Sequence, residues 1–149
     1  LIHNDYKYDN LVLDANEPAR ILAVLDWEMA TVGDTRMDLG TTLAYWTEPA
    51  EAKLMQLAAG NLTWLPGNLN RAEVVERYQQ TTGHELGPIL FYYAYGAFKI
   101  AVIVQQIYRR WKQGHSKDPR FSQLIHAVHY FGNLARLAIE KDRISNLVS

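Results

Sequence analysis

The first ten residues carry the side chains best suited to chemistry. His3, Asp5 and Asn10 follow one another in the pattern H-x-D-x-x-x-x-N. An apolar, strand-like run further on ends in a second acid, Asp26. An Asp that orients a hydroxyl, followed by an Asn and an acid that bind metal, is the order of a phosphoryl-transfer site. The spacing therefore predicts a site of that kind at the start of the chain.

Two short apolar runs must position these side chains. Residues 11–13 and 21–25 are rich in Leu, Ile and Val, and Asn, Asp and Pro lie between them. This pattern predicts a β-hairpin. If the hairpin is centred near Pro18, paired residue numbers sum to 36, and Asn10 lies opposite Asp26. An amide oxygen beside a carboxylate suits Mg²⁺, which takes oxygen ligands and completes its shell with water and substrate phosphates.

These residues resemble the catalytic segment of the aminoglycoside phosphotransferase family, whose members share the protein-kinase fold. The similarity is to the branch of small-molecule kinases related to phosphotransferase domains linked to acyl-CoA dehydrogenases. It covers His3 to about Leu39 with specific motifs, and the rest of the chain is compatible with the helical lobe of the family. The resemblance implies transfer of the γ-phosphate of ATP, with Mg²⁺, to a hydroxyl of a small molecule.

The same resemblance implies a role for each matching residue. Asp5 is the catalytic Asp that orients the substrate hydroxyl and accepts its proton. Lys7 lies at the transferring phosphate, as both a catalytic and a cofactor-binding residue. Asn10 and Asp26 are the magnesium ligands and so also bind the cofactor. Asp38, at the start of a helix, braces the backbone of the catalytic loop.

Two further residues are expected to support the site without doing its chemistry. His3 is expected to fix the loop with its ring rather than to shuttle a proton. Glu28 lies two residues past Asp26 and either assists the metal or lies on the surface.

Each of the principal residues also has an ordinary structural interpretation. Asp5 could be a solvated loop acid, and Asn10 could close a turn. Asp26 could end a strand or cap the segment after it. Lys7 fits a solvated surface charge equally well. An acid such as Asp38 in the first turn of a helix complements the helix dipole without further function.

Past Glu28 the sequence pattern predicts helices. The starts are marked by Asp34, by Asn70 with Glu73, by Pro88 and by Asp118-Pro119. The helices are expected over about residues 35–47, 50–59, 70–82, 88–112 and 119–141. The predicted fold class is α+β, mostly α-helical: the C-terminal lobe of a protein-kinase-like fold with a catalytic loop and a β-hairpin.

Composition narrows the class of protein. The 149 residues are 48% hydrophobic, enough for one domain with a real core, and there is no cysteine for a disulfide framework or thiolate site. The net charge of −1 produces no electrostatic field that would attract nucleic acid or an anionic membrane. The apolar stretch 89–108 is interrupted by Lys99, which favours a buried helix over a membrane span. A cytoplasmic enzyme is expected.

The chain lacks a glycine-rich phosphate-covering loop, which kinase-like enzymes carry in an N-terminal lobe. Residues 1–149 are therefore expected to form one C-terminal lobe fragment, with the catalytic loop and metal-binding hairpin over 1–28 and a helical subdomain over 29–149. The missing lobe of the parent chain is the expected partner, and association with a second copy of this chain is also compatible with the sequence. An apolar patch is expected around Leu1, Ile2 and the hairpin. The fragment alone is expected to be inactive.

Several alternatives stay open from the sequence. The lobe could be a catalytically silent, kinase-like binding module, although the presence of Asp5, Asn10 and Asp26 together argues against that. It could also be a helical protein outside the kinase fold with an accidental motif. The acceptor is not specified either: aminoglycosides, hydroxyacyl compounds and amino-alcohols are all compatible with a hydroxyl-bearing small molecule.

Overall fold

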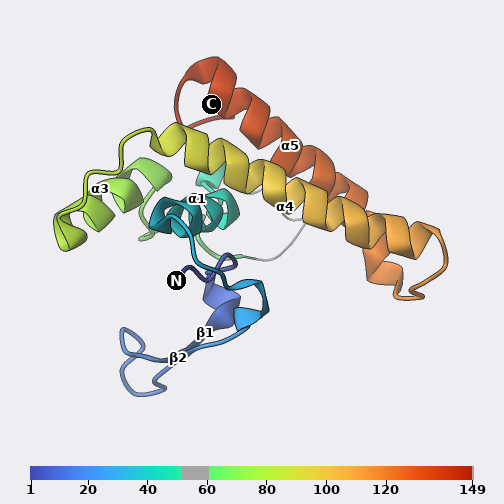
Figure 1. The fold of residues 1–149 in the computed structure, drawn as a ribbon, viewed down its shortest axis with the longest axis horizontal. Helices are drawn as coiled ribbons and strands as arrows, with labels where there is room; N and C mark the ends of the chain where they lie inside the picture. The colour runs from blue at the N-terminus through green and yellow to red at the C-terminus, as the bar shows by residue number, and fades with distance from the viewer. Residues whose placement is uncertain (52–60, 149) are drawn as a thin grey trace.

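The computed structural model describes residues 1–51 and 61–148 as a mostly helical chain with one small β-hairpin (Figure 1). The helices are α1 (Thr35–Tyr45), α3 (Arg71–Thr82), α4 (Ile89–Lys112) and α5 (Leu124–Lys141). The strands are β1 (Leu11–Leu13) and β2 (Ile21–Val24), and short 3₁₀ helices cover Tyr8–Asn10, Trp27–Met29, Pro49–Glu51 and Pro119–Gln123. The α+β, mainly helical class is confirmed. The helix expected over 50–59 lies largely outside the described residues.

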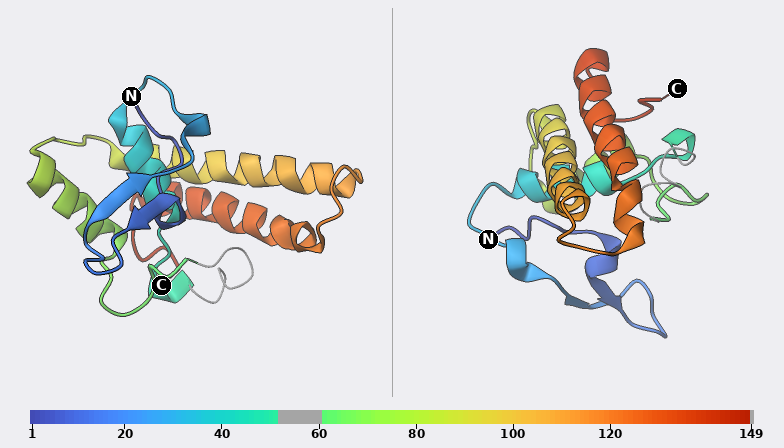
Figure 2. Two further views of the ribbon diagram at one scale, coloured as in Figure 1. Left: turned by 90° about the horizontal axis from the view of Figure 1, so that it is seen from below. Right: turned by 90° about the vertical axis from the view of Figure 1, so that its right-hand side faces the viewer.

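The two longest helices form the body of the chain. Helices α4 and α5 run side by side, and α1 packs across α4 (Figure 2). The hairpin reaches away from α4 and α5 on the other side of α1 (Figure 1). None of the described helices, α4 included, is long and apolar enough to cross a membrane.

Local side-chain chemistry sets the ends of the helices. Asp34 caps α1 by accepting a hydrogen bond from the amide of Arg36 at 3.0 Å. Asn70 and Glu73 form the predicted capping box of α3, each side chain accepting from the other's backbone amide, at 3.0 and 2.7 Å. Gly83 ends α3 in the left-handed conformation. These predicted boundaries are confirmed.

The last predicted helix begins differently from expectation. Asp118 does cap it, accepting from the amide of Arg120, and Pro119 occupies its first turn. That turn is 3₁₀ rather than α-helical, a common form at helix N-termini, and α5 proper begins at Leu124.

The hairpin forms as predicted, but its register differs. The first two pairs have residue numbers that sum to 35, and a bulge after Val12 shifts the next pair to 34, leaving Leu22 without a partner in the ladder. The backbone oxygen of Asn10 accepts a hydrogen bond from the amide of Leu25 at 2.8 Å. The prediction that Asn10 lies opposite Asp26 is therefore wrong by one residue, because the pairs next to Asn10 are centred between Glu17 and Pro18 rather than at Pro18.

The core lies where α4 meets α1 and α5. Gly40 of α1 and Gly96 of α4 face each other at a close crossing. A Cβ atom on Gly40 would lie 2.3 Å from the carbonyl oxygen of Tyr92, and one on Gly96 would lie 2.6 Å from the carbonyl oxygen of Gly40. Only glycine permits this approach. The side chains buried around it include Leu43, Tyr93, Ala97, Ile100, Leu134 and Ala138.

A buried ionic cluster anchors the end of α1. Arg71 is fully buried, and its guanidinium pairs with Glu51 and, at 3.7 Å, with Glu48. It also donates to the backbone carbonyls of Leu43, Trp46 and Ile144. Because two of these carbonyls close the last turn of α1, the cluster holds the turn that carries Tyr45.

Apolar side chains are exposed on the hairpin, as predicted, but the patch has different limits. Leu1 is 78% exposed, whereas Ile2 is buried because its backbone pairs with Thr31 and its side chain packs on Gly33. The expectation for Ile2 is therefore wrong. The exposed hairpin residues are Val12, Leu13, Ile21, Leu22 and Leu25.

Candidate active site

Three side chains converge on the carboxylate of Asp5. The ammonium of Lys7 lies 2.7 Å from Oδ2, and the hydroxyl of Tyr45 donates to Oδ1 at 2.8 Å. The amide nitrogen of Asn10 donates to Oδ2 at 3.1 Å and to the backbone oxygen of Asp5 at 2.7 Å. A carboxylate offers about four lone-pair sites, so Asp5 is held in one orientation and can still accept one further donor.

Lys7 and Tyr45 also contact each other. The ammonium of Lys7 lies 4.9 Å from the centre of the Tyr45 ring, a cation–π distance. Burial and then the negative charge of Asp5 raise the pKa of the Tyr45 phenol far above its ordinary value. The phenol therefore stays protonated and remains a donor to Asp5. Lys7 thus balances the charge of Asp5, and Tyr45 adds a neutral hydrogen bond to the same carboxylate.

His3 is buried and ties the loop to the hairpin. Its Nε2 lies 2.7 Å from the backbone oxygen of Leu25, and its Nδ1 accepts from the amide of Asp5 at 3.2 Å. These two contacts require the Nε2–H tautomer. Both ring nitrogens are engaged with backbone atoms, so the ring orients Asp5 and has no free nitrogen for proton transfer.

The bracing contact expected of Asp38 is present. Its two carboxylate oxygens accept from the backbone amides of His3 at 2.7 Å and Asn4 at 2.5 Å. The amide of a residue just before Asp5 is thereby fixed to the first turn of α1. Acids in this turn also complement the helix dipole, and the two roles are compatible.

Asn10 and Asp26 lie at the open end of the hairpin. Asn10 is buried, and because its amide nitrogen bonds to Asp5, its amide oxygen is the atom left to bind a metal. Asp26 directly follows Leu25, the hydrogen-bond partner of Asn10, and adopts a left-handed backbone with φ 64°. Within the described part of the chain, neither Asp26 nor the exposed Glu28 has a hydrogen-bonding or ionic side-chain partner.

This donor set suits a metal that takes only part of its shell from protein. Over residues 1–51 and 61–148 there is no group of three or more His, Cys, Asp or Glu that could hold a metal ion by itself. One amide oxygen and one carboxylate match Mg²⁺, which keeps several waters and takes further ligands from phosphates. They do not match the closed, nitrogen- and sulfur-rich shell of structural zinc.

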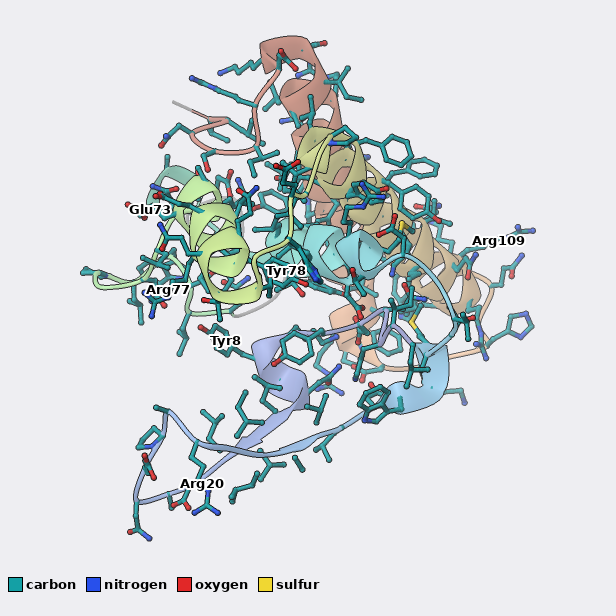
Figure 3. The ribbon with its side chains drawn as sticks, turned by 60° about the vertical axis from the view of Figure 1, so that its left-hand side comes forward. Tyr8, Arg20, Glu73, Arg77, Tyr78 and Arg109 are labelled. Atoms are coloured by element: carbon teal, nitrogen blue, oxygen red, sulfur yellow. The ribbon has the colours of Figure 1, made fainter. Side chains whose placement is uncertain are left out.

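A cavity of about 670 Å³ opens beside Lys7 and Tyr45. The loop lines one side of it, and α1, α3, α4 and α5 line the others. Tyr8 of the loop and Tyr78 of α3, both labelled in Figure 3, are part of the wall. The volume is in the range of small-molecule sites, and most of the lining is apolar.

One face of α1 carries contacts that the sequence analysis missed. Asp38, Thr42 and Tyr45 have the spacing i, i+4, i+7 and so share a helix face. They bond in order to the loop backbone, to the carbonyl of Tyr6 at 2.8 Å and to the carboxylate of Asp5. The spacing of these three side chains on one face of the helix was the signal that could have found Thr42 and Tyr45.

Residues 1–80 match the phosphotransferase enzyme family. The chain belongs to this family. The resemblance found in the motifs is thus confirmed, and the matched region contains the whole loop, the hairpin and α1. Membership indicates a kinase-like phosphotransferase.

The curated relatives of this phosphotransferase-family chain agree with the expected branch. It is 33% identical over 129 residues to mouse acyl-CoA dehydrogenase family member 10, covering 83% of this chain and 12% of that protein. It is 31% identical over 122 residues to human acyl-CoA dehydrogenase family member 11 (79% and 15%). It is 28% identical over 144 residues to the chicken member 11 (95% and 18%). The chain thus spans less than a fifth of each relative. No solved structure gives a significant match.

Proposed function

We propose that this chain carries the catalytic loop of an ATP- and Mg²⁺-dependent kinase that phosphorylates a hydroxyl of a small molecule. The observation that carries the proposal is the oriented carboxylate of Asp5, which is held by Lys7 and Tyr45, two residues in the wall of a cavity large enough for a metabolite. Phosphoryl transfer needs little covalent chemistry from protein, and depends on positioning and charge neutralisation.

In this proposal Asp5 accepts a hydrogen bond from the acceptor hydroxyl and takes its proton as the hydroxyl oxygen bonds to the γ-phosphorus of ATP, while the bond from that phosphorus to ADP breaks and ADP leaves. Lys7, already bound to Asp5, neutralises negative charge on the phosphate being transferred. Tyr45 holds the carboxylate in one orientation through its hydrogen bond to Oδ1. The acceptor occupies the space between the loop and the helices, where its hydroxyl can reach Asp5.

Asn10 and Asp26 would hold Mg²⁺ through one amide oxygen and one carboxylate oxygen. The bound ion would neutralise charge on the phosphates of ATP. His3 and Asp38 keep the loop in place through their backbone contacts, and Glu28 is near enough in sequence to assist Asp26. We further propose that the exposed hairpin residues, with Leu1, contact the nucleotide-binding lobe of a protein-kinase-like fold.

The test uses the full-length protein that contains this chain. Asp5→Asn should lower kcat by about 10²–10⁴-fold, the range of general-base contributions, with nucleotide affinity nearly unchanged. Asp26→Asn should weaken Mg²⁺-nucleotide binding as well as turnover, and excess metal should partly restore both. The control Asp14→Asn makes the same chemical change at the turn end of the hairpin, the end opposite Asn10 and Asp26, and should leave kinetics unchanged.

Two results would count against the proposal. Equal, small effects of Asp5→Asn, Lys7→Ala and Asp26→Asn would mean that the motif is not catalytic. Wild-type protein that binds Mg²⁺-ATP but transfers no phosphate to water or to any hydroxyl compound of a broad panel would favour the silent binding module instead.

A further inference from the structure

Lys99 is a charged side chain in an apolar stretch of α4, and neither the motif nor the proposed chemistry uses it. It is half-buried between the exposed Phe98 and the buried Ile100. Its ammonium donates to the backbone oxygen of Asn4 at 2.7 Å and to the hydroxyl of Thr41 at 3.1 Å. These contacts join α4 to the catalytic loop across 95 residues of sequence.

The bonded carbonyl belongs to the peptide that joins Asn4 to Asp5. Asn4 adopts a left-handed backbone with φ 68°, which Asn tolerates better than most residues but which still needs support from its surroundings. Its amide is held by Asp38, and its carbonyl is held by Lys99. The peptides on both sides of this unusual conformation are therefore clamped, one by an anion and one by a cation.

The glycine crossing brings the ammonium to this place. Gly96 precedes Lys99 by three residues, and Gly40 directly precedes Thr41, so both partners sit within one turn of the closest approach of α1 and α4. The Thr41 hydroxyl donates to the carbonyl of Met37 at 2.9 Å and is thus oriented to accept from Lys99. A wider crossing would leave the ammonium out of reach of the loop.

The half-buried position is energetically unfavourable for a lysine, because its ammonium loses part of its hydration. Desolvation lowers the pKa of Lys99, and only the negative charges of Asp5 and Asp38 act in the opposite direction. An exposed site or an apolar side chain would avoid that cost. Charge-assisted hydrogen bonds to a backbone carbonyl are among the stronger ones available to hold a loop.

We infer that Lys99 is a positioning residue of the phosphotransferase: by clamping the Asn4–Asp5 peptide it sets where the Asp5 carboxylate points. For catalysis the inference rests on the proposed function, whereas the ordering of the loop stands on its own. Lys99 does not line the cavity beside Lys7 and Tyr45, and it acts through the backbone of Asn4.

The experiment compares Lys99→Met, Lys99→Arg and Lys112→Met in the full-length protein. Lys112→Met makes the same change in the exposed last turn of the same helix and serves as the control. Lys99→Met should raise hydrogen-exchange rates of the His3 and Asn4 amides by about tenfold or more, because a charge-assisted bond is lost. It should lower kcat by about 10–100-fold, as expected when a reacting group is misplaced, with the KM for ATP nearly unchanged.

The outcomes separate positioning from general stability. Lys99→Met should not lower the melting temperature, because it also removes a desolvated charge, and Lys99→Arg should recover part of the lost rate. Loop exchange and kcat equal to those of Lys112→Met would overturn the inference. If the wild-type protein transfers no phosphate, the exchange rates alone still decide whether Lys99 orders the loop. If Lys99→Met fails to fold, Lys99→Gln provides the test, because it keeps a polar side chain but removes the charge and shortens the reach to the Asn4 carbonyl; unchanged exchange at Asn4 in that variant would equally overturn the inference.

Discussion

The close crossing of α1 and α4 predicts that the same substitution, glycine to alanine, destabilises the protein at the crossing and stabilises it at a helix position outside the crossing. A Cβ atom would lie 2.3 Å from a backbone oxygen at Gly40 and 2.6 Å from one at Gly96, whereas ordinary contacts begin at 3.4 Å. Both obstructing atoms are backbone carbonyls, which cannot rotate away as a side chain can. Alanine at either position therefore requires the two helices to separate by about 1 Å, which loosens the packed core around them.

The magnitude is the balance of two opposing effects. Overpacking a core typically costs about 1–3 kcal/mol, and alanine recovers at most about 1 kcal/mol through its better helix propensity. Gly40→Ala and Gly96→Ala should therefore each lower the free energy of unfolding, by up to about 2 kcal/mol. Gly132 is the control: it lies within α5, and a Cβ there would meet nothing within 4 Å. Gly132→Ala should raise the free energy of unfolding by up to about 1 kcal/mol.

Urea denaturation of the purified protein, followed by circular dichroism, measures all three variants. The midpoints should move in opposite directions while the slope with denaturant stays constant, because the surface exposed on unfolding is unchanged. Stabilisation by Gly40→Ala or Gly96→Ala comparable to that of Gly132→Ala would refute the reasoning. It would mean that α1 and α4 separate without cost and that the close approach is not needed by the fold.

Two further predictions concern buried polar groups. Burial raises the pKa of three of the nine tyrosines, Tyr45, Tyr93 and Tyr130, well above the ordinary value of about 10. A spectrophotometric titration should therefore show these three phenols ionising only as the protein unfolds. Their contribution to the free energy of unfolding is fully present below about pH 10 and decreases above it, because the phenols then ionise in the unfolded chain alone. Arg71→Met should lower the free energy of unfolding by about 3–5 kcal/mol, since it leaves buried carboxylates without their cation. Arg136→Met, which breaks an exposed pair, should change the free energy by less than about 1 kcal/mol in the same denaturation assay.

The sequence alone determined the features that depend on neighbours within a few residues. The capping box of Asn70 and Glu73, the cap at Asp34 and the stop at Gly83 were readable because each joins atoms at most four positions apart. The order of Asp5, Asn10 and Asp26 likewise indicated the family, because a motif of fixed order and spacing can be recognised in the sequence without the fold. None of these inferences required knowledge of how the helices pack.

Tertiary structure decided the strand register and the contacts between segments that are far apart in the sequence. The bulge after Val12 changed the register and placed Asn10 beside Leu25, a detail that strand patterns leave open because side chains on either side of a bulge look the same in sequence. The contact of Tyr45 with Asp5 spans 40 residues, and that of Lys99 with Asn4 spans 95. The first depends on how α1 packs against the loop, and the second depends on the distance at which α1 and α4 cross. That geometry is set by two glycines and the surrounding core, and it exists only once the chain is packed.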